Sequence, residues 1–522
     1  MKRFLLMLLV CAMLAGCFAG CGMTGDRPGD TTASSQGGDV IASDQTAVTE
    51  KAETSLYDAD GYLKDSLPER LDYGLEEIQI LYWNNGELGP GEFDPGEDET
   101  GFLQKSVYTR NMVTEDRLNV VLQWKGVAGT SNDRTTFFNT VAVAFSGGDA
   151  TRLDLIAGYS LNMATLAVQG FTKDLMTSSK YLSLEKPWWP DSLVNDLTIS
   201  GKLYFASGDI STSFIGTMLS VFVNKAYYPD QNLYDLVYND QWTLETMCKM
   251  VKDKRFDRGE LDKKDVEDRF GLVVGWTGYL DGFLYGSDLI TVDHDAKGEL
   301  HVNSDYVGEK ADTLCETLKT LFGSDDAWMP GPNDPDSLHK DAINLFAAGE
   351  VAMMVGTGTT ILVYDSMLNT RVNYAVLPMP KYDENQKDYK SVNLNLYTLW
   401  SIFGRSDALQ AERAGAVMEC LGATGYRTVS PLLLEKCLKV RYANDEDTGK
   451  MYDIIRAGVV FDPGRIFASG ALGGLPQEKW QRSVIFNSSW GAQSMTVDSQ
   501  LQDKLDALSE SFRNNTENSD PD

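Results

Sequence analysis

The segment from residue 341 to residue 380 constrains the fold most strongly, because helical and strand patterns alternate within it. An amphipathic stretch is followed by the apolar run 351–355, the small polar residues 356–360, a second helical stretch and the apolar run 374–377. This alternation is typical of a parallel, helix-covered sheet, which binds ligands at the carboxyl ends of its strands. We therefore expect residues 356–360 to form a loop that is one wall of a ligand site.

Strand and helix patterns alternate through much of the remaining chain as well, which favours an α/β fold. A chain of 522 residues is too long for one hydrophobic core, so two lobes are expected. The further expected strands are 78–83, 120–124, 153–157, 202–205, 219–223, 270–274 and 392–403, with a hairpin near 293–302. The further expected helices are 105–118, 135–145, one capped by Thr243, 305–322, 407–424, 431–439 and 448–458.

The first residues have the pattern of a lipoprotein export signal. Lys2-Arg3 precede an apolar stretch, 4–13, that is too short to span a membrane as a helix. Residues 14–17, Leu-Ala-Gly-Cys, match the bacterial lipobox and predict a signal peptide of residues 1–16 with lipidation of Cys17. Cys21 is the alternative lipidation site, and an ordinary secretory peptide is the alternative signal. A cysteine with more than one acyl chain anchors a protein stably.

Composition predicts flexible ends and limits the kinds of partner. Residues 17–74 are expected to be a tether, because its first part is rich in Thr, Ser, Gly and Asp, and residues 512–522 are expected to be a disordered tail. The formal charge of −30 argues against nucleic acid or an anionic membrane surface as partner, since both require a basic face.

Motifs for cofactor, metal or nucleophilic chemistry are missing from the sequence. The seven Cys contain no CxxC pair, the three His form no HExxH, and no P-loop or dinucleotide fingerprint occurs. Residues 252–265 resemble a calcium loop, but Lys254, Phe256 and Arg258 would occupy its first ligand positions. We expect no cofactor, no metal and no catalytic residue. A carboxylate pair for glycoside hydrolysis stays open, because the chain has 76 acidic residues of unknown spacing.

Loops at the ends of the expected strands carry aromatic, amide and carboxylate side chains. Such groups suit a sugar, which offers hydroxyls to Asp and Asn and an apolar face to an aromatic ring, and the same mixture suits a peptide. Each residue has a structural alternative, such as packing under a lobe or capping a turn. The expected ligand-binding residues are Trp83, Asn84, Asn85, Asp154, Tyr159, Asp209, Trp276, Asp281, Gly356, Thr357 and Tyr397.

The order and spacing of several motifs resemble the extracellular solute-binding proteins of bacterial ABC importers. The similarity spans roughly residues 75–500 and is greatest to carbohydrate-binding family 1, which includes maltose-binding protein. The motifs are GKLYF at 201–205 with VFVNK at 221–225, Trp242-Thr243 at a helix start, FAAGEVAM at 346–353, and YAVLPMPK at 374–381. Many members carry a Trp directly after the Gly that follows the AM strand. This chain has Thr357 there, so Trp276 or Trp328 would have to supply the aromatic platform.

This resemblance implies a two-lobed, periplasmic-binding-protein-like α/β fold. Each lobe would be a helix-covered, mostly parallel sheet, joined by hinge segments crossing near Asp209, 375–378 and Thr428. Lobe 1 would comprise residues 75–208 with 377–427, and lobe 2 residues 209–376 with 428–511.

The implied function is capture of a small polar ligand, most plausibly an oligosaccharide, outside the cell. The partners would be that ligand, the ABC permease and the membrane through the lipid anchor, with the protein itself a monomer. The alternatives are a peptide or another polar solute, a secreted lipoprotein glycosidase, and a sensor subunit.

Overall fold

The computed structural model describes residues 57, 61–84, 91–147, 152–261, 263–275, 277–330, 338–434 and 446–515. The chain divides into residues 1–55 and a compact unit of residues 56–522, and only the second unit is considered below. Three residues singled out from the sequence, Cys17, Asn85 and Trp276, lie outside the described residues.

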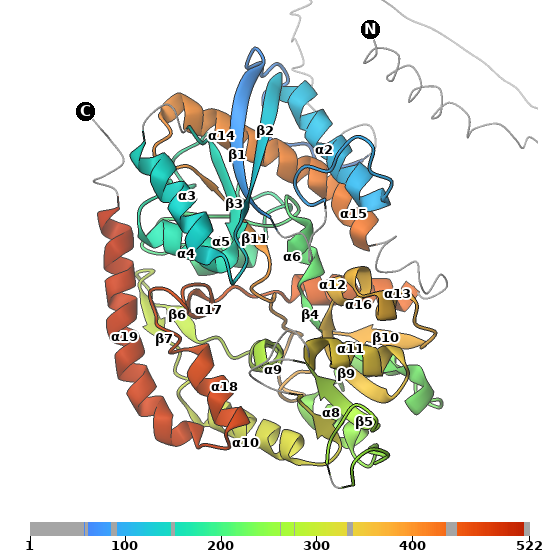
Figure 1. The fold of residues 1–522 in the computed structure, drawn as a ribbon. Helices are drawn as coiled ribbons and strands as arrows, with labels where there is room; N and C mark the ends of the chain where they lie inside the picture. Colours follow the sequence, from blue (N-terminus) through green and yellow to red (C-terminus); the bar gives the residue numbers. More distant parts are fainter. Residues whose placement is uncertain are drawn as a thin grey trace, which may run out of the picture. The chain divides into compact units, whose positions relative to one another are not determined.

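The first sheet has four strands in the order β11-β3-β1-β2. β1 pairs in parallel with β2 and β3, and β11 pairs antiparallel with β3. The middle of β1 is mostly buried and its two ends are not, whereas β3 is buried throughout, as expected of a strand covered on both faces. Helices α2 and α14 pack together beside this sheet, and so do α3 and α4 (Figure 1). The bounds are β1 Glu76–Asn84, α2 Phe102–Leu118, β2 Val120–Ala128, α3 Arg134–Ser146, β3 Leu155–Tyr159, α4 Ser160–Val168, α5 Asp191–Leu197, β11 Thr398–Ile402 and α14 Ala408–Thr424.

The second sheet has five strands in the order β10-β4-β9-β5-β8. β5 is parallel to both β8 and β9, while β4 lies between β9 and β10 and runs antiparallel to both. All residues of β4, β9 and β10 are buried, which explains their continuous apolar runs. The bounds are α6 Thr212–Gly216, β4 Leu219–Asn224, η2 Lys225–Tyr227, α7 Leu233–Tyr238, α8 Leu244–Val251, β5 Phe270–Val274, η3 Thr277–Tyr279, α9 Leu280–Gly286, β8 Ala327–Trp328, α11 Leu338–Ala347, β9 Val351–Thr357, α12 Gly358–Val363, α13 Asp365–Leu368, β10 Tyr374–Leu377 and α16 Glu446–Ala457.

A third group of elements contains a hairpin and the C-terminal helices. Helix α19 packs on α10, α18, β7 and α4 along one side of the unit (Figure 1). The bounds are β6 Val292–His294, β7 Leu300–Val302, α10 Glu309–Gly323, α17 Pro463–Ile466, α18 Gln477–Ile485 and α19 Trp490–Asn514, with the π-helix η4 Gly425–Val429 and α15 Ser430–Leu432 following α14.

Three segments of chain connect the two sheets. Residues 206–218 lead from the first sheet to β4, residues 378–397 lead from β10 back to β11, and the chain after α14 leads to α16, which packs on β10. Isolated antiparallel β-bridges join the first two segments: Ala206 pairs with Trp400 of β11, and Met218 pairs with Asn393. The second crossing lies after Leu377, because β10 stays in the second sheet up to that residue.

Four expectations are corrected. Residues 202–205 form no strand, although Lys202 makes an isolated bridge to Ile199. Residues 356–360 are not a loop, because β9 runs to Thr357 and α12 starts at once with a capping box between Thr357 and Thr360. Folded chain begins before Leu75, since Leu67 is buried and Arg117 donates to its carbonyl. The C-terminal tail begins later, because Phe512 is buried in α19.

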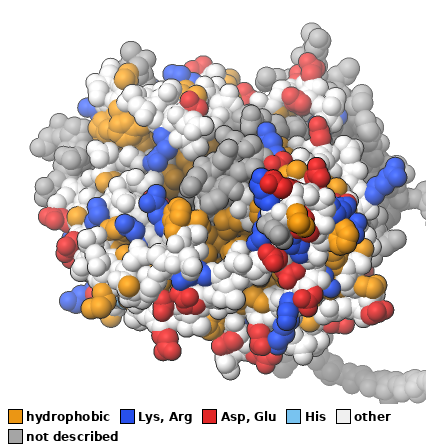
Figure 2. Space-filling view, turned by 60° about the horizontal axis from the view of Figure 1, so that its bottom comes forward, with side chains coloured by type: hydrophobic (Ala, Val, Ile, Leu, Met, Phe, Trp, Pro, Cys, Tyr) orange, Lys and Arg blue, Asp and Glu red, His pale blue; other side chains and the backbone are white. Residues whose placement is uncertain are grey.

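The surface carries charges of both signs despite the acidic composition. Figure 2 shows acidic and basic side chains interspersed over one face, with one crowded mixed group. Among the described residues, no helix is both long and apolar enough to cross a membrane. Cys315 and Cys420 are buried and Cys248 is half-buried, all three as free thiols within helices.

Glu419 of α14 gives the folded protein a specific pH dependence. It is fully buried, and its Oε2 accepts hydrogen bonds from the indole N–H groups of Trp188 and Trp189 and from the amide of Ser183, each at 3.2 Å. Burial raises the pKa of Glu419 from 4.5 to about 7. A carboxyl with a raised pKa stabilises the folded state fully below its unfolded pKa and loses that contribution as the pH rises through the folded pKa.

We therefore expect wild type to lose roughly 3 kcal/mol of stability relative to Glu419→Gln as the pH rises from about 4.5 to 7, by the conversion of a pKa shift into free energy. Urea unfolding of both proteins at several pH values measures this difference. Parallel pH curves for the two proteins would contradict it.

Candidate functional site

The carboxyl ends of β1 and β3 lie side by side and present two stacked aromatic rings. Trp83 and Tyr159 stack with ring centroids 5.4 Å apart, and the Trp83 indole N–H donates to Thr398 Oγ1 at 2.9 Å. Trp83 is completely buried and Tyr159 is 5% exposed. Because Trp83 is fixed by both contacts, it holds the Tyr159 ring in a defined orientation.

Arg465 of α17 brings together groups from several distant segments. Its Nε donates to Asp281 Oδ2 of α9 at 3.0 Å, and its Nη1 donates to Asn395 Oδ1 at 2.6 Å. Gln481 of α18 donates to the other Asp281 oxygen at 2.6 Å. Both members of the Arg465–Asp281 ion pair are almost fully buried, at 3% and 4% side-chain exposure. We call Tyr159, Asp281, Asn395, Tyr397, Arg465 and Gln481 the Arg465 cluster.

The backbone joins the tyrosines to this cluster. The amide of Ser160 donates to the Tyr397 carbonyl at 3.1 Å, and the Ser160 hydroxyl donates to the Asn395 carbonyl at 2.6 Å. The crossing segment 378–397 therefore docks its last residues on the first turn of α4. Neither the Tyr159 hydroxyl nor the Tyr397 hydroxyl hydrogen-bonds another described residue, so both keep unused hydrogen-bonding capacity, although the two side chains are only 5% and 1% exposed.

The electrostatics of the cluster follow from its burial. Burial raises the pKa of Tyr159 to about 12, although Arg134 and Arg465 act in the opposite direction. Burial likewise raises the pKa of Tyr397, against the influence of Arg465. Both hydroxyls therefore keep their protons at neutral pH and can donate. Burial also raises the pKa of Asp281, and Arg465 and Gln481 oppose that shift.

Gly356 and Thr357 end β9 and lead directly into α12, which packs on α6. Thr357 caps α12, and Thr359 of that helix donates to the Gly216 carbonyl at the end of α6 at 2.9 Å. Gly356 has little room for a side chain, because an added Cβ would lie 2.3 Å from the Phe222 ring. The backbone of α6 and α12 is therefore closely packed at this point.

The remaining predicted residues lie elsewhere. Asp154 lies just before β3, at the opposite end from Tyr159, where it accepts from Arg152 and from the Gln79 amide. Asp209 is buried in the first crossing segment and pairs with Arg456 of α16 at 2.7 Å. Asn84 is exposed at the end of β1. Trp328 is stacked on Phe270 at 5.0 Å in the second sheet.

The structure thus brings together Trp83, Tyr159, Asp281 and Tyr397 from the predicted set. Sequence reasoning missed Asn395, Arg465 and Gln481, which contribute the central polar contacts. Asp281 and Arg465 are 184 residues apart. Asp462-Pro463 was the available signal, because Asp followed by Pro marks a helix start. That signal indicates where the helix begins, but it does not indicate that Arg465 pairs with Asp281.

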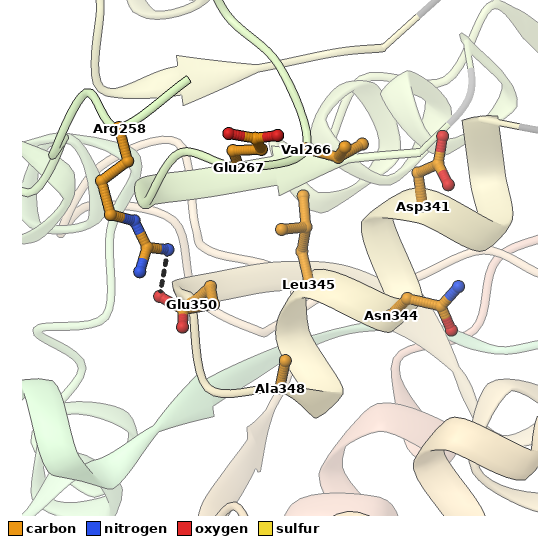
Figure 3. A pocket seen from close by; sticks show the side chains of 8 residues that line it. All are labelled: Arg258, Val266, Glu267, Asp341, Asn344, Leu345, Ala348 and Glu350. Carbon is orange, nitrogen blue, oxygen red and sulfur yellow. Dashed lines mark hydrogen bonds and ion pairs between the residues drawn. The ribbon is translucent and has the colours of Figure 1, made fainter.

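An open pocket of about 480 Å³ lies on the second sheet's side, at the amino end of β9 and therefore away from Gly356 (Figure 3). Arg258 and Glu350 form an ion pair across one side of it at 2.7 Å. Asp268, which follows the lining residue Glu267 in sequence, accepts from Arg255 and from the backbone amides of residues 258 and 259, so its carboxylate already has an ion-pair partner and hydrogen bonds. The other lining residues are Val266, Glu267, Asp341, Asn344, Leu345 and Ala348.

Three crossing segments join the two sheets, and a buried polar and aromatic cluster lies at their junction. The family model described as bacterial extracellular solute-binding protein matches residues 129–424, more than half of the chain. This chain therefore belongs to that family. A search of curated proteins finds no match.

Solved structures show the same two-lobed fold. A cyclo/maltodextrin-binding protein complexed with maltotetraose aligns with a TM-score of 0.51 at 13% identity, covering 84% of this chain and 98% of that one. UgpB from Mycobacterium tuberculosis, in complex with glycerophosphocholine, aligns with a TM-score of 0.52 at 13% identity, covering 82% and 98%. The expected fold class is confirmed, and at this identity the likeness concerns the fold alone.

Proposed function

We propose that this protein captures an oligosaccharide at the Arg465 cluster and delivers it to an ABC importer. The observation that carries the proposal is the convergence of ring and polar groups from both sides of the junction. Tyr159, backed by Trp83, offers an aromatic face, and two tyrosine hydroxyls and a guanidinium offer hydrogen bonds. A structural neighbour described with maltotetraose is in accord with this ligand class.

In this proposal the protein is a monomer, uses no cofactor and performs no chemistry. Ligand contacts that are better in a closed arrangement of the two lobes would shift the population towards closure. Lobe 1, residues 75–208 with 377–427, would carry Tyr159 and Tyr397, while lobe 2, residues 209–376 with 428–511, would carry Asp281 and Arg465.

A thermal-shift screen tests the proposal. The protein would be the mature chain carrying Cys17→Ala, which cannot be acylated at that position, and the probes would be oligosaccharides and short peptides. A ligand that binds only the folded state raises the free energy of unfolding, by about 2.7 kcal/mol at a concentration of 100 times Kd, and therefore raises the Tm. We expect an oligosaccharide to raise the Tm and to be recovered intact. If only peptides raise the Tm, the ligand is a peptide and not an oligosaccharide. Recovery of cleaved sugar would indicate a glycosidase.

We further propose that a lipid on Cys17 anchors the protein at the outer face of the membrane. Support comes from the lipobox at residues 14–17 and from membership of an extracellular family. Cys17→Ala is expected to release the protein from the membrane fraction, with Cys21→Ala as the matched control that stays bound. If Cys21→Ala is released and Cys17→Ala stays bound, the lipid is on Cys21 instead.

A further inference from the structure

The hydrogen-bonding capacity left over in the Arg465 cluster is mostly of the donor type. Both oxygens of Asp281 already accept from Arg465 and Gln481, and Asn395 Oδ1 accepts from Arg465. The Asn395 carbonyl accepts from the Ser160 hydroxyl. The Nη2 group of Arg465 and the hydroxyls of Tyr159 and Tyr397 bond no described residue, and the Gln481 side-chain oxygen accepts from none, so the unused groups are mainly donors.

Arg134 adds a second cation beside Tyr159. Arg134 is the first residue of α3, and its Nε donates to Asn162 Oδ1 at 3.2 Å while its Nη2 donates to the Leu161 carbonyl at 3.4 Å. These partners lie in the first turn of α4, directly after Tyr159. Within the described part of the chain, Arg134 forms no ion pair, and the neighbouring Asp133 carboxylate accepts from the Thr130 hydroxyl.

The charges near Tyr159 therefore do not cancel. Arg465 is matched by Asp281, whereas the half-buried Arg134 is matched by no carboxylate among the residues described. Glu92 is a buried carboxylate in the network that holds Trp83: its Oε1 accepts from Ser213, which also donates to Thr398, the acceptor of the Trp83 indole N–H. Among the described residues, neither Arg134 nor Arg465 forms an ion pair with Glu92, so the Arg134 charge next to Tyr159 stays unpaired.

We propose that the solute is an acidic oligosaccharide, whose carboxylate binds between Arg134 and the Arg465 cluster. This inference rests on the proposed function and narrows its ligand class. Arg134 and Arg465 both keep unused guanidinium N–H groups beside Tyr159, and a charged acceptor uses these donors better than a neutral sugar hydroxyl does. A uronate carboxylate accepts several hydrogen bonds and suits the planar guanidinium group, and bonds between charged partners are roughly twice as strong as neutral ones.

The first test compares matched ligands on the mature chain carrying Cys17→Ala. The probes are uronic-acid oligosaccharides of galacturonate, glucuronate and mannuronate type, the methyl ester of each, and neutral malto- and cello-oligosaccharides of equal length. Methyl esterification removes the charge but keeps the ring and its hydroxyls. We expect calorimetry to show one acidic series binding at least ~10-fold more tightly than its ester, the factor that one lost charge-assisted bond of about 1.4 kcal/mol gives.

The second test changes the protein. Arg134→Gln is expected to weaken binding of the acidic oligosaccharide by ~10-fold or more, while Arg134→Lys keeps part of the affinity because it keeps the charge. Arg482→Gln is the matched control, since Arg482 lies on the exposed face of α18 and its loss changes the net charge equally. The Tm of each variant without ligand shows whether the fold is kept.

Each outcome is decisive. An acidic series that loses affinity on esterification and in Arg134→Gln, but not in Arg482→Gln, supports the inference. Equal binding of acid and ester, or binding of neutral oligosaccharides alone, overturns the inference and leaves the proposed function intact. If no oligosaccharide of either kind binds, the proposed function itself fails, and the inference with it.

Discussion

Replacing Arg465 by methionine is expected to lower the free energy of unfolding by about 3–5 kcal/mol, the cost of removing one partner from a buried ion pair. The Asp281 carboxylate would stay buried without its countercharge, and Asn395 would lose its donor. Ligand binding would be lost as well, because Arg465 holds segments from α9, α17 and the second crossing in one arrangement. Guanidinium unfolding and calorimetry measure the two effects.

Two further variants separate charge from geometry. Arg465→Lys keeps the charge but not the planar donor group, so we expect it to be more stable than Arg465→Met and still defective in binding. Adding Asp281→Asn to Arg465→Met removes the unpaired carboxylate and should recover part of the lost stability. A single Arg465→Met variant as stable as wild type would show that the pair contributes nothing to folding.

Replacing Trp83 by alanine is expected to cost about 3–5 kcal/mol, as large-to-small changes of a buried aromatic residue do. Trp83 is fully buried, stacks on Tyr159 and donates to Thr398. Tyr159 would then lose its support, so affinity should fall together with stability. Chemical unfolding and ligand titration of the variant test both.

Trp83→Phe and Trp328→Ala are the controls for this prediction. Trp83→Phe keeps a stacked ring and loses only the indole donor, and Thr398 Oγ1 still has Ser213 as a partner, so a cost of about 1 kcal/mol is expected. Trp328 packs on Phe270 in the second sheet, so its replacement should leave affinity unchanged. Lost affinity in Trp328→Ala with normal binding in Trp83→Ala would place the site at the second sheet instead.

The strands were predictable where burial on both faces leaves a continuous apolar run. Residues 270–274 and 374–377 carry no polar side chain and residues 219–223 only that of Ser220, and the structure places all three runs in the second sheet. The direction of these strands could not be predicted in the same way, because β4 is as apolar as its neighbours yet runs antiparallel to β9 and β10. The residues of a strand indicate how deeply it is buried, whereas its direction is set by the connections on either side.

The candidate site was predictable only in part, for a similar reason. Tyr159 is the last residue of a buried strand, so its position at the carboxyl edge of the sheet could be inferred. Asp154 is also a polar residue next to this strand, but it lies before the strand, where it accepts a hydrogen bond from Arg152. Arg465 lies in a four-residue helix far along the chain, and its contact with Asp281 arises only from tertiary packing.

Helix α19 limits how the two sheets can move. Its first turn is tied to α10, where Trp490 donates to the Tyr306 carbonyl and Gly491 donates to Asp312. Its last turn lies against elements beside the first sheet: Phe512 packs edge-on on Tyr204, and the C-cap residue Asn515 donates to the Ala167 carbonyl of α4. A helix of this length is a rod of about 37 Å, from 1.5 Å per residue, and it resists extension. Moving α10 and α4 apart along the helix axis would therefore require one end of α19 to detach.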